Sequence, residues 1–444
     1  MDATQILPQF GGAAFTLLAF VVALSIIVAI HEYGHYIVGR WTGIKAEVFS
    51  LGFGPVLFSR TDRHGTTWQV AALPFGGYVK FLGDANAASV GGTADSIDHA
   101  RRRQTMLGAP LWARAATVAA GPFANFLLTV VIFMALALTQ GRPTDPLTIA
   151  ELAPLPPAIA QELRPGDEIL AIAGRPVTVE TLGEAVEDLS PTDSVPYAIR
   201  RDGEELTVAG PHPFPPVAAS VAPNSAAWDV GIRAGDVILS VDGQPVSAFD
   251  ELVDLVRESE GRALSLLVWR DGEEIEFTVA PRRADLPLPE GGFETRWLVG
   301  LTAGPFFAAE TESPGLVAAF VDSLAQLWFV ITSSLSGFAH MITGAISTCN
   351  LSGPVGIAET SGAMAEQGAL SFVSFLAVLS AAVGLMNLFP IPILDGGHLV
   401  FHAWEAVTGR PPGGRALRVL MAAGLSLLLS TMVWAIANDL FLCP

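Results

Sequence analysis

The sequence predicts a polytopic α-helical membrane protein with four transmembrane helices, a membrane-associated β-hairpin and two tandem α+β domains. Its 444 residues are 51% hydrophobic with a mean hydropathy of +0.48, which is too apolar for an ordinary soluble protein. Four apolar runs near the two ends of the chain are long enough to cross a bilayer. The polar stretch between them contains an internal repeat, which indicates two copies of one small domain.

The charge and the cysteine content exclude some classes of protein. The net charge is −19, and no long basic run argues for nucleic-acid binding. Cys349 and Cys443 are too few and too far apart for a disulfide framework or a cysteine-based zinc site. The N-terminus lacks the basic region and the cleavage site of a signal peptide, so we expect the first apolar run to be a retained span.

The first span, expected over residues 13–38, carries the motif HEYGH. On a helix, His31 and His35 leave the same face and can occupy two corners of a tetrahedral zinc site. Glu32 can take the proton from a metal-bound water, as in a metalloprotease. Residues 15–30 include no charged side chain, so such a site would lie within the membrane. A His pair that only caps a helix is the alternative, but ionisable side chains in an apolar span are costly and tend to be functional.

Residues 45–82 are rich in strand formers and glycine, and their alternation predicts a β-hairpin that turns at about 63–65. Residues 49–57 and 68–73 are unusually apolar for a solvated loop. We therefore expect the hairpin to return towards the membrane, against the metal site, where irregular backbone is tolerated if it lines a cavity. A small surface hairpin is the alternative.

The second span, expected over residues 115–138, contains the sequence GPFAN and completes an N-terminal membrane part over 1–143. Its small residues permit close contact between helices, and Asn125 is a polar group that requires a partner inside the bundle. A simple proline kink at Pro122 is an equally good explanation of this stretch.

The soluble part repeats itself at a fixed distance. Residues 163–177 (LRPGDEILAIAGRPV) are matched 69 residues later by residues 232–246 (IRAGDVILSVDGQPV), and RDGEEL at 201–206 is matched at the same offset. A constant offset predicts two domains in tandem, at 144–213 and 214–284. Each should run strand, turn, strand, helix, strand, turn, strand.

This pattern resembles the PDZ domain in its circularly permuted bacterial form. Such domains capture an extended peptide or a peptide terminus by adding it as a strand to a sheet edge. Domains that only fill space or block access are the alternative. The first copy is proline-rich at 153–158, which removes backbone donors and makes its groove less certain.

The C-terminal membrane part, 285–444, contains a third span at about 372–394 and a fourth at about 419–436. Residues 315–338 are also apolar. If the metal site is completed at the end of the third span, that span must run in the same direction as the first, which requires an odd number of spans between them. The second span already supplies one, so we interpret 315–338 as an interfacial amphipathic helix.

Basic residues predict the topology. They gather between the first and second spans and between the third and fourth, whereas the two chain ends have none. The positive-inside rule places those loops in the cytoplasm and both termini outside. The tandem domains would then be periplasmic, and the metal site would face the cytoplasmic half of the bilayer. The loop residues are Arg40, Lys45, Arg60, Arg63, Lys80, Arg101, Arg102, Arg103 and Arg114, and then Arg410, Arg415 and Arg418.

The third ligand is expected in the sequence NLFPIPILDGGH, residues 387–398. Asp395 would complete a site with the two histidines and leave a fourth position for water. His398 is the rival ligand. Asn387 precedes two prolines that should break the helix, and its amide could bind the substrate backbone or a developing oxyanion. A helix-packing hydrogen bond is the alternative for Asn387.

Together, HEYGH, FGGYVKF, GPFAN, the tandem PDZ-like repeat and N-x-x-P-x-P-x-LDGG resemble the site-2 protease family, and more narrowly its regulator of sigma-E protease branch. The resemblance covers nearly the whole chain. It implies an intramembrane zinc metalloendopeptidase of the bacterial inner membrane. Such an enzyme makes the second cut in regulated intramembrane proteolysis of a single-pass protein, typically an anti-sigma factor, and similar members clear remnant signal peptides.

The resemblance also implies roles for particular residues. It assigns zinc ligation to His31, His35 and Asp395, and the general base to Glu32. It assigns substrate contact to Asn387, Gly76 and Gly77. The PDZ-like pair would act as a size filter or bind peptide termini, and lipid would surround the spans. A metal-binding transporter and a catalytically silent scaffold remain as alternatives, although a structural metal site does not need Glu32.

Overall fold

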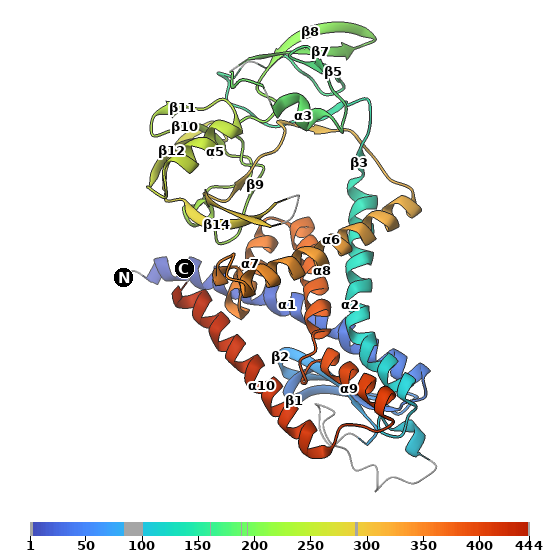
Figure 1. Cartoon of the computed structure of the whole chain (residues 1–444). Helices are drawn as coiled ribbons and strands as arrows, with labels where there is room; N and C mark the ends of the chain where they lie inside the picture. Colours follow the sequence, from blue (N-terminus) through green and yellow to red (C-terminus); the bar gives the residue numbers. More distant parts are fainter. Residues whose placement is uncertain are drawn as a thin grey trace. The chain divides into compact units, whose positions relative to one another are not determined.

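The computed structural model of the protein describes residues 3–83, 101–159, 161–187, 189–192, 194–288 and 292–442. The chain forms two compact units (Figure 1). The helical unit comprises residues 1–136, 317–341 and 348–444, and the β-rich unit comprises 137–316 and 342–347.

The helical unit contains long apolar helices in the predicted places. In the described part of the chain, five helices are long and apolar enough to cross a membrane. Four of them fall on the predicted spans, and the fifth is the segment predicted to be interfacial, so the number of spans stays a prediction. They are α1 (Ala3–Trp41), α2 (Leu111–Gln140), α6 (Leu316–Ile342), α8 (Ala369–Asn387) and α10 (Gly414–Ala437).

Two further helices were not predicted. The third span was expected to continue to residue 394, but α8 ends at Asn387, before the two prolines. The loop expected before the fourth span contains a separate helix, α9 (Asp395–Thr408), which ends at Gly409 in the left-handed conformation. The other helix is α7 (Pro354–Glu366), which packs mainly against α1 and also contacts α8.

The N-terminus of α7 is held by the end of the chain that follows α10. The Asp439 carboxylate accepts hydrogen bonds from the amides of Gly353 and Gly356, both at 2.9 Å. A side chain on Gly353 would collide with that carboxylate, at 2.6 Å. The sequence SGPVG therefore provides a close docking point for the last helical turns.

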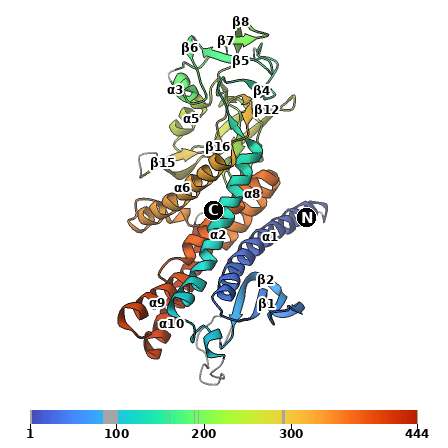
Figure 2. The ribbon, with the colours of Figure 1, turned by 90° about the vertical axis from the view of Figure 1, so that its right-hand side faces the viewer.

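The predicted hairpin is present as β1 (Ala46–Thr61) and β2 (Thr67–Phe81), and both views place it beside α1 (Figures 1 and 2). Both strands bend, so that residues 46–51 pair with 77–81 on one side and with 67–70 on the other. The turn is closed by the Asp62 carboxylate, which accepts hydrogen bonds from the His64 amide and the Trp68 indole. Burial opposes ionisation of Asp62, but these hydrogen bonds outweigh it and lower its pKa to about 2.

One end of the hairpin is buried and the other exposes apolar side chains. Tyr36 of α1 packs with Phe49, Val79 and Phe81 in a small core. Around the bend, large apolar side chains are exposed, which suits a surface that meets lipid or substrate. They are Phe53, Val56, Leu57, Phe58, Val70 and Leu73.

The β-rich unit contains two similar four-stranded sheets. The first has the order β6-β5-β7-β8, and the second has the order β11-β10-β12-β13. In the sequence, β6 of the first sheet is followed by helix α3 (Leu182–Glu187), and β11 of the second sheet is followed by helix α5 (Phe249–Glu258). The strands are β5 (Glu168–Ile172), β6 (Arg175–Pro176), β7 (Val195–Arg201), β8 (Glu204–Gly210), β10 (Val237–Val241), β11 (Gln244–Pro245), β12 (Leu264–Arg270) and β13 (Glu273–Val279).

The two sequence motifs that repeat are joined by the same ion pair in both copies. Arg201, at the RDG turn, binds the buried Asp167 with two hydrogen bonds of 2.7 Å. Arg270 binds Asp236 in the same way, at 2.7 and 2.6 Å. Each aspartate belongs to the GD pair of its copy, so this contact explains why GD and RDG recur at one offset.

Each copy is completed by a strand from beyond residue 284. In the first, β4 (Ile149–Leu152) pairs with β17 (Phe307–Ala309), and Phe306 and Phe307 lie in the core beside Tyr197. In the second, β9 (Ser220–Val221) pairs with β16 (Leu301–Thr302). The second copy is thus inserted in the sequence of the first, which the repeat alone did not reveal.

Four further strands belong to the unit. The strands β14 (Arg282–Pro287) and β15 (Phe293–Leu298) form a hairpin before the completing strands. Then β18 (Thr311–Glu312) pairs with β3 (Arg142–Pro143), which directly follows α2.

Candidate metal centre

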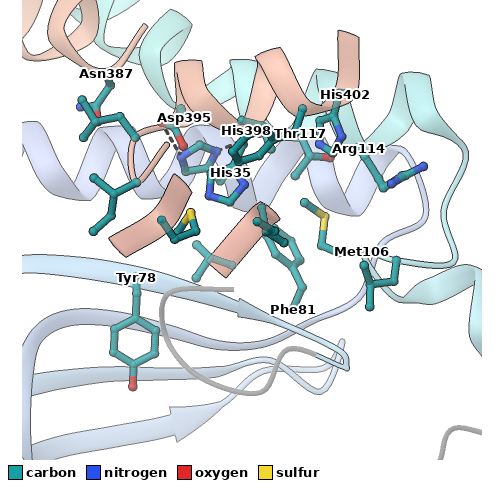
Figure 3. Close-up of a pocket in the computed structure, with 18 of the residues that line it drawn as sticks. His35, Tyr78, Phe81, Met106, Arg114, Thr117, Asn387, Asp395, His398 and His402 are labelled. Carbon is teal, nitrogen blue, oxygen red and sulfur yellow. Dashed lines mark hydrogen bonds and ion pairs between the residues drawn. The ribbon is translucent and has the colours of Figure 1, made fainter. Parts of the chain in front are cut away.

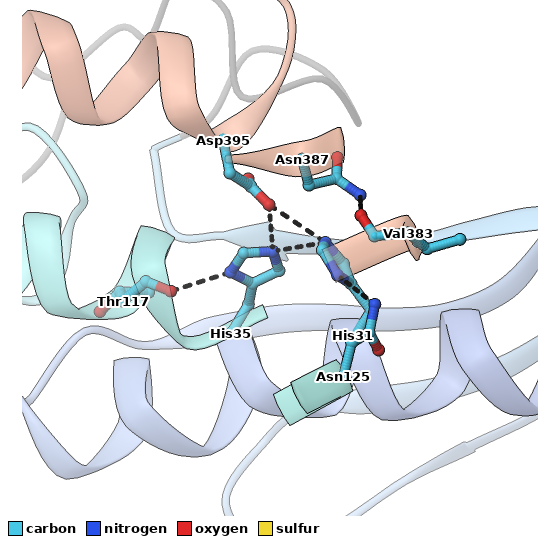
Figure 4. A network of polar contacts seen from close by, with 7 residues as sticks. All are labelled: His31, His35, Thr117, Asn125, Val383, Asn387 and Asp395. Carbon is cyan, nitrogen blue, oxygen red and sulfur yellow. Dashed lines mark hydrogen bonds and ion pairs between the residues drawn. The ribbon is translucent and has the colours of Figure 1, made fainter. Parts of the chain in front are cut away.

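The structure brings together three side chains that the sequence predicted as metal ligands. His31 and His35, one turn apart on α1, direct their Nε2 atoms to the same point, 3.2 Å from each other. Asp395 Oδ2 lies 3.1 Å from His31 Nε2 and 3.4 Å from His35 Nε2 (Figure 4). Among the described residues, they form the group of His, Cys, Asp and Glu side chains that could hold a metal ion.

The spacing of these atoms fits a tetrahedral zinc ion. Ligand atoms about 2.0–2.1 Å from zinc stand about 3.3 Å apart along the edges of a tetrahedron. The three observed separations, 3.1, 3.2 and 3.4 Å, lie close to that value. Asp395 Oδ2 is buried and has no hydrogen-bond partner among the described residues. Two imidazole nitrogens and a carboxylate oxygen are ligand types that zinc takes, so the donor set fits zinc.

The orientation of His35 is fixed from α2. Its Nδ1 donates a hydrogen bond of 2.8 Å to the Thr117 carbonyl oxygen. A carbonyl can only accept, so the proton is on Nδ1 and the lone pair on Nε2 is free for a metal. The Nδ1 atom of His31 lies 3.2 Å from the side-chain amide of Asn125, which follows Thr117 by eight residues on α2.

Gly121 allows α2 to press its backbone directly against the two imidazoles. A Cβ at this position would lie 2.5 Å from His35 Cε1 and 2.8 Å from His31 Nε2. On the facing helix, a Cβ on Gly34 would lie 2.7 Å from that of Ala124. The GPFAN sequence therefore makes room for the site.

Asp395 is placed by the turn between α8 and α9. It is the first residue of α9, after a segment in which Pro390 and Pro392 prevent continuation of α8. Side chains on Gly396 and Gly397 would collide with the backbone of residues 388–392. The two glycines thus let the first turn of α9 fold against the segment before it, which holds the carboxylate beside α1.

Glu32 and two of the three predicted substrate residues, Gly77 and Asn387, line one cavity with the proposed ligands. This cavity has a volume of about 430 Å³ and is bounded by α1, α2, α9 and strand β2 (Figure 3). The Val79 amide of β2 hydrogen-bonds to Glu32. A Cβ on Gly77 would lie 2.7 Å from the Ser50 carbonyl oxygen and 3.4 Å from Glu32 Cγ, so glycine lets this strand approach the carboxylate. Gly76 has a φ of +117° and packs against Phe53.

The other two candidates are near the metal group without belonging to it. Asn387 lines the cavity, but its Nδ2 donates to the carbonyl oxygen of Val383 in its own helix, at 2.9 Å. His398 also lines the cavity and packs against Phe401. The described geometry groups Asp395, rather than His398, with the two histidines.

An ion pair in the same cavity was not predicted. Arg114, at the start of α2, forms two hydrogen bonds with Glu405 of α9, at 2.6 and 3.0 Å, and both side chains are largely buried. The sequence predicts a loop at residue 405 and offers no pattern that connects it with Arg114. An acidic residue in an apolar stretch was the only available hint.

Comparisons with known proteins agree on one family. The model of peptidase family M50 matches residues 19–431. A protein of Rhizobium meliloti named as a zinc metalloprotease is 36% identical over 432 residues, which is 96% of each chain. The regulator of sigma-E protease RseP of Salmonella typhimurium is 32% identical, covering 96% of this chain and 98% of its own. The Escherichia coli protein of that name is also 32% identical, covering 95% and 98%.

Proposed function

This chain belongs to peptidase family M50 and is a zinc metalloprotease, and from that premise we propose that it cleaves membrane-spanning proteins within the bilayer. One observation carries the proposal. His31, Glu32 and His35 lie in α1, a helix whose apolar stretch is long enough to cross a membrane, and Asp395 of α9 meets the two histidines there. A zinc metalloprotease with this placement would meet peptide bonds at membrane depth.

The two histidines and Asp395 would hold the zinc ion, which supplies Lewis-acid polarisation and acidifies a water molecule. Glu32 accepts the proton of the attacking water and later delivers it to the leaving amine. The hydrogen bond from the Val79 amide keeps the Glu32 carboxylate directed into the cavity. The substrate carbonyl must therefore reach the space between Glu32 and the ligands.

The substrate must be extended at the point of cleavage, because a helix buries its own amides. Residues 77–81 of β2 pair with 46–51 on one side and run past Glu32 on the other, which suits a strand that guides an extended segment. Gly76 and Gly77 keep this strand free of side chains near the site. Asn387, at the opposite wall, would bind the substrate backbone when its amide leaves the Val383 carbonyl.

The biological setting follows from the relatives that are named regulators of sigma-E protease. We infer that the chain makes the second cut in regulated intramembrane proteolysis, on a single-pass substrate of the anti-sigma-factor type, and that it also clears remnant signal peptides. It would reside in the bacterial inner membrane with the β-rich unit in the periplasm. The two PDZ-like copies would exclude bulky uncut substrates or bind their new termini.

The test is cleavage of a tagged single-span substrate, already truncated on its outer side, by the wild type and by Glu32→Gln. We expect the variant to lose the cytosolic fragment while it retains zinc, because Glu32 is not a ligand. Glu359→Gln, which changes a carboxylate of α7 outside the cavity, serves as the matched control and should cleave normally. Equal cleavage by Glu32→Gln would refute the catalytic assignment and favour the scaffold or transporter.

A further inference from the structure

The second span contains a buried amide that contacts a proposed ligand. Asn125 is fully buried in α2, and its side chain lies against Nδ1 of His31, the ring nitrogen that faces away from the other two ligands (Figure 4). Its Oδ1 atom is buried and has no hydrogen-bond partner among the described residues. A buried amide oxygen without a partner is costly, so its position calls for an explanation.

The orientation of the amide decides where the proton of His31 lies. In the orientation of Figure 4, Asn125 Nδ2 is 3.2 Å from His31 Nδ1 and would donate to it. His31 would then carry its proton on Nε2, which points at Asp395 and His35 and could not bind a metal. Turning the amide by 180° exchanges its oxygen and nitrogen without moving any other group, and such orientations are assigned from hydrogen bonding.

We propose that Asn125 is a positioning residue, whose Oδ1 accepts the Nδ1 proton of His31 and thereby presents the Nε2 lone pair to zinc. Either orientation leaves one atom of the amide without a partner, so hydrogen bonding of the amide does not distinguish the two orientations. The need for a lone pair on His31 Nε2 favours the orientation in which Oδ1 faces His31. The inference rests on the proposed zinc ligation by His31.

In this proposal, α2 supplies a hydrogen-bond acceptor to the Nδ1 atom of each histidine. The Thr117 carbonyl accepts from His35 Nδ1. The side-chain amide of Asn125, eight residues later, lies 3.2 Å from His31 Nδ1 and, once turned, would accept from it through Oδ1. Partners that accept from the outer nitrogen of a ligating imidazole fix its tautomer and its ring orientation. A helical carbonyl serves His35, but no backbone acceptor is placed for His31 in the described structure, so a side chain takes this role.

The backbone at Asn125 is itself fixed. Its carbonyl oxygen accepts hydrogen bonds from Ser380 of α8, at 3.0 Å, and from Thr129 of α2, at 3.1 Å. Thr129 also donates to the carbonyl of Ala377 at 2.9 Å, which ties α2 to α8 at this level. The amide is therefore held at the junction of three helices rather than on a mobile surface.

The test measures zinc affinity of the full-length protein in detergent, by competition with a chelator, for three variants. Asn125→Leu keeps the branched shape of the side chain and removes the acceptor, and we expect it to weaken zinc binding by about 10–100-fold. Asn125→Asp keeps an acceptor oxygen at the same place and should bind zinc within a few-fold of the wild type. Ser380→Ala, the matched control, removes a neighbouring hydrogen bond that does not reach His31 and should leave the affinity unchanged.

Several results would overturn the proposal. Wild-type affinity in Asn125→Leu would show that the acceptor is not needed. Equal weakening in Asn125→Leu and Asn125→Asp would show that the amide donates or only packs. Melting of the zinc-free proteins checks folding, and Asn125→Met replaces the leucine variant if that one fails to fold.

His31→Ala separates this inference from the proposed function. If it binds zinc normally, the ligand set is wrong whatever Asn125 does. If it loses zinc while Asn125→Leu does not, the ligand set stands and only the positioning role is refuted.

Discussion

Gly121→Ala changes the centre by one methyl group. The new Cβ would lie 2.5 Å from His35 Cε1 and 2.8 Å from His31 Nε2. Ordinary contact between carbon atoms begins at about 3.5 Å, so the His35 ring must withdraw by about 1 Å or α1 must separate from α2. A misplacement of about 1 Å costs on the order of 100-fold in rate, which corresponds to about 2.7 kcal/mol in the activation free energy.

The assay for Gly121→Ala combines zinc affinity with the rate of substrate cleavage, measured in the same detergent preparation. Both should fall, because the displaced ring belongs to a proposed zinc ligand. Gly12→Ala is the matched control: it makes the same substitution in α1, where a Cβ meets no atom within 4 Å, and it should behave as wild type. If Gly121→Ala binds zinc and cleaves at the wild-type rate, the inference that α2 packs too closely on the two imidazoles to admit a methyl group is refuted.

Three further predictions follow from other contacts. Arg114→Leu should destabilise the protein by about 3–5 kcal/mol in chemical denaturation, because Glu405 is left buried and unpaired, and the double variant with Glu405→Leu should recover most of the loss. The Asp62 carboxylate has a folded pKa of about 2, below its usual 3.8, so it stabilises the hairpin above about pH 4 and this contribution is lost as the pH falls towards 2. Limited proteolysis of the hairpin should show that loss in the wild type, and Asp62→Asn should not show it. Phe306→Ala should cost the first copy of the repeat about 3–5 kcal/mol, seen as early loss of amide protection in its sheet but not in the second copy.

The grouping of the proposed ligands could be predicted from the sequence because it depends on local spacing. HEYGH places two proposed ligands and a proposed base on one helical turn, and the glycines after Asp395 indicate a close turn. The sequence also favoured Asp395 over His398, and the structure groups it with the histidines. Helix α9 was missed because its polar face was interpreted as a loop, and the Arg114–Glu405 pair was missed with it.

In the β-rich unit, the sequence predicted the repeated strands but not the short strands that complete each copy. The repeat predicted two similar sheets, because GD and RDG recur at one offset and each pair closes an ion pair. It did not show that Leu301 and Phe307 belong to strands that complete those sheets. Strands of two and three residues carry too little alternation to be recognised. The partner of Asn125 was equally hidden, since it depends on how α1 and α2 meet.

The insertion of one copy within the other sets an order of events during synthesis. The second copy has all its strands once residue 302 has emerged, whereas the first must wait for Phe306 and Phe307 even though its sheet was complete near residue 210. At ~5–20 residues per second, that wait lasts on the order of 5–20 s. The second copy can therefore complete its fold before the first. The first copy stays incomplete until the strand that contains Phe307 has been synthesised.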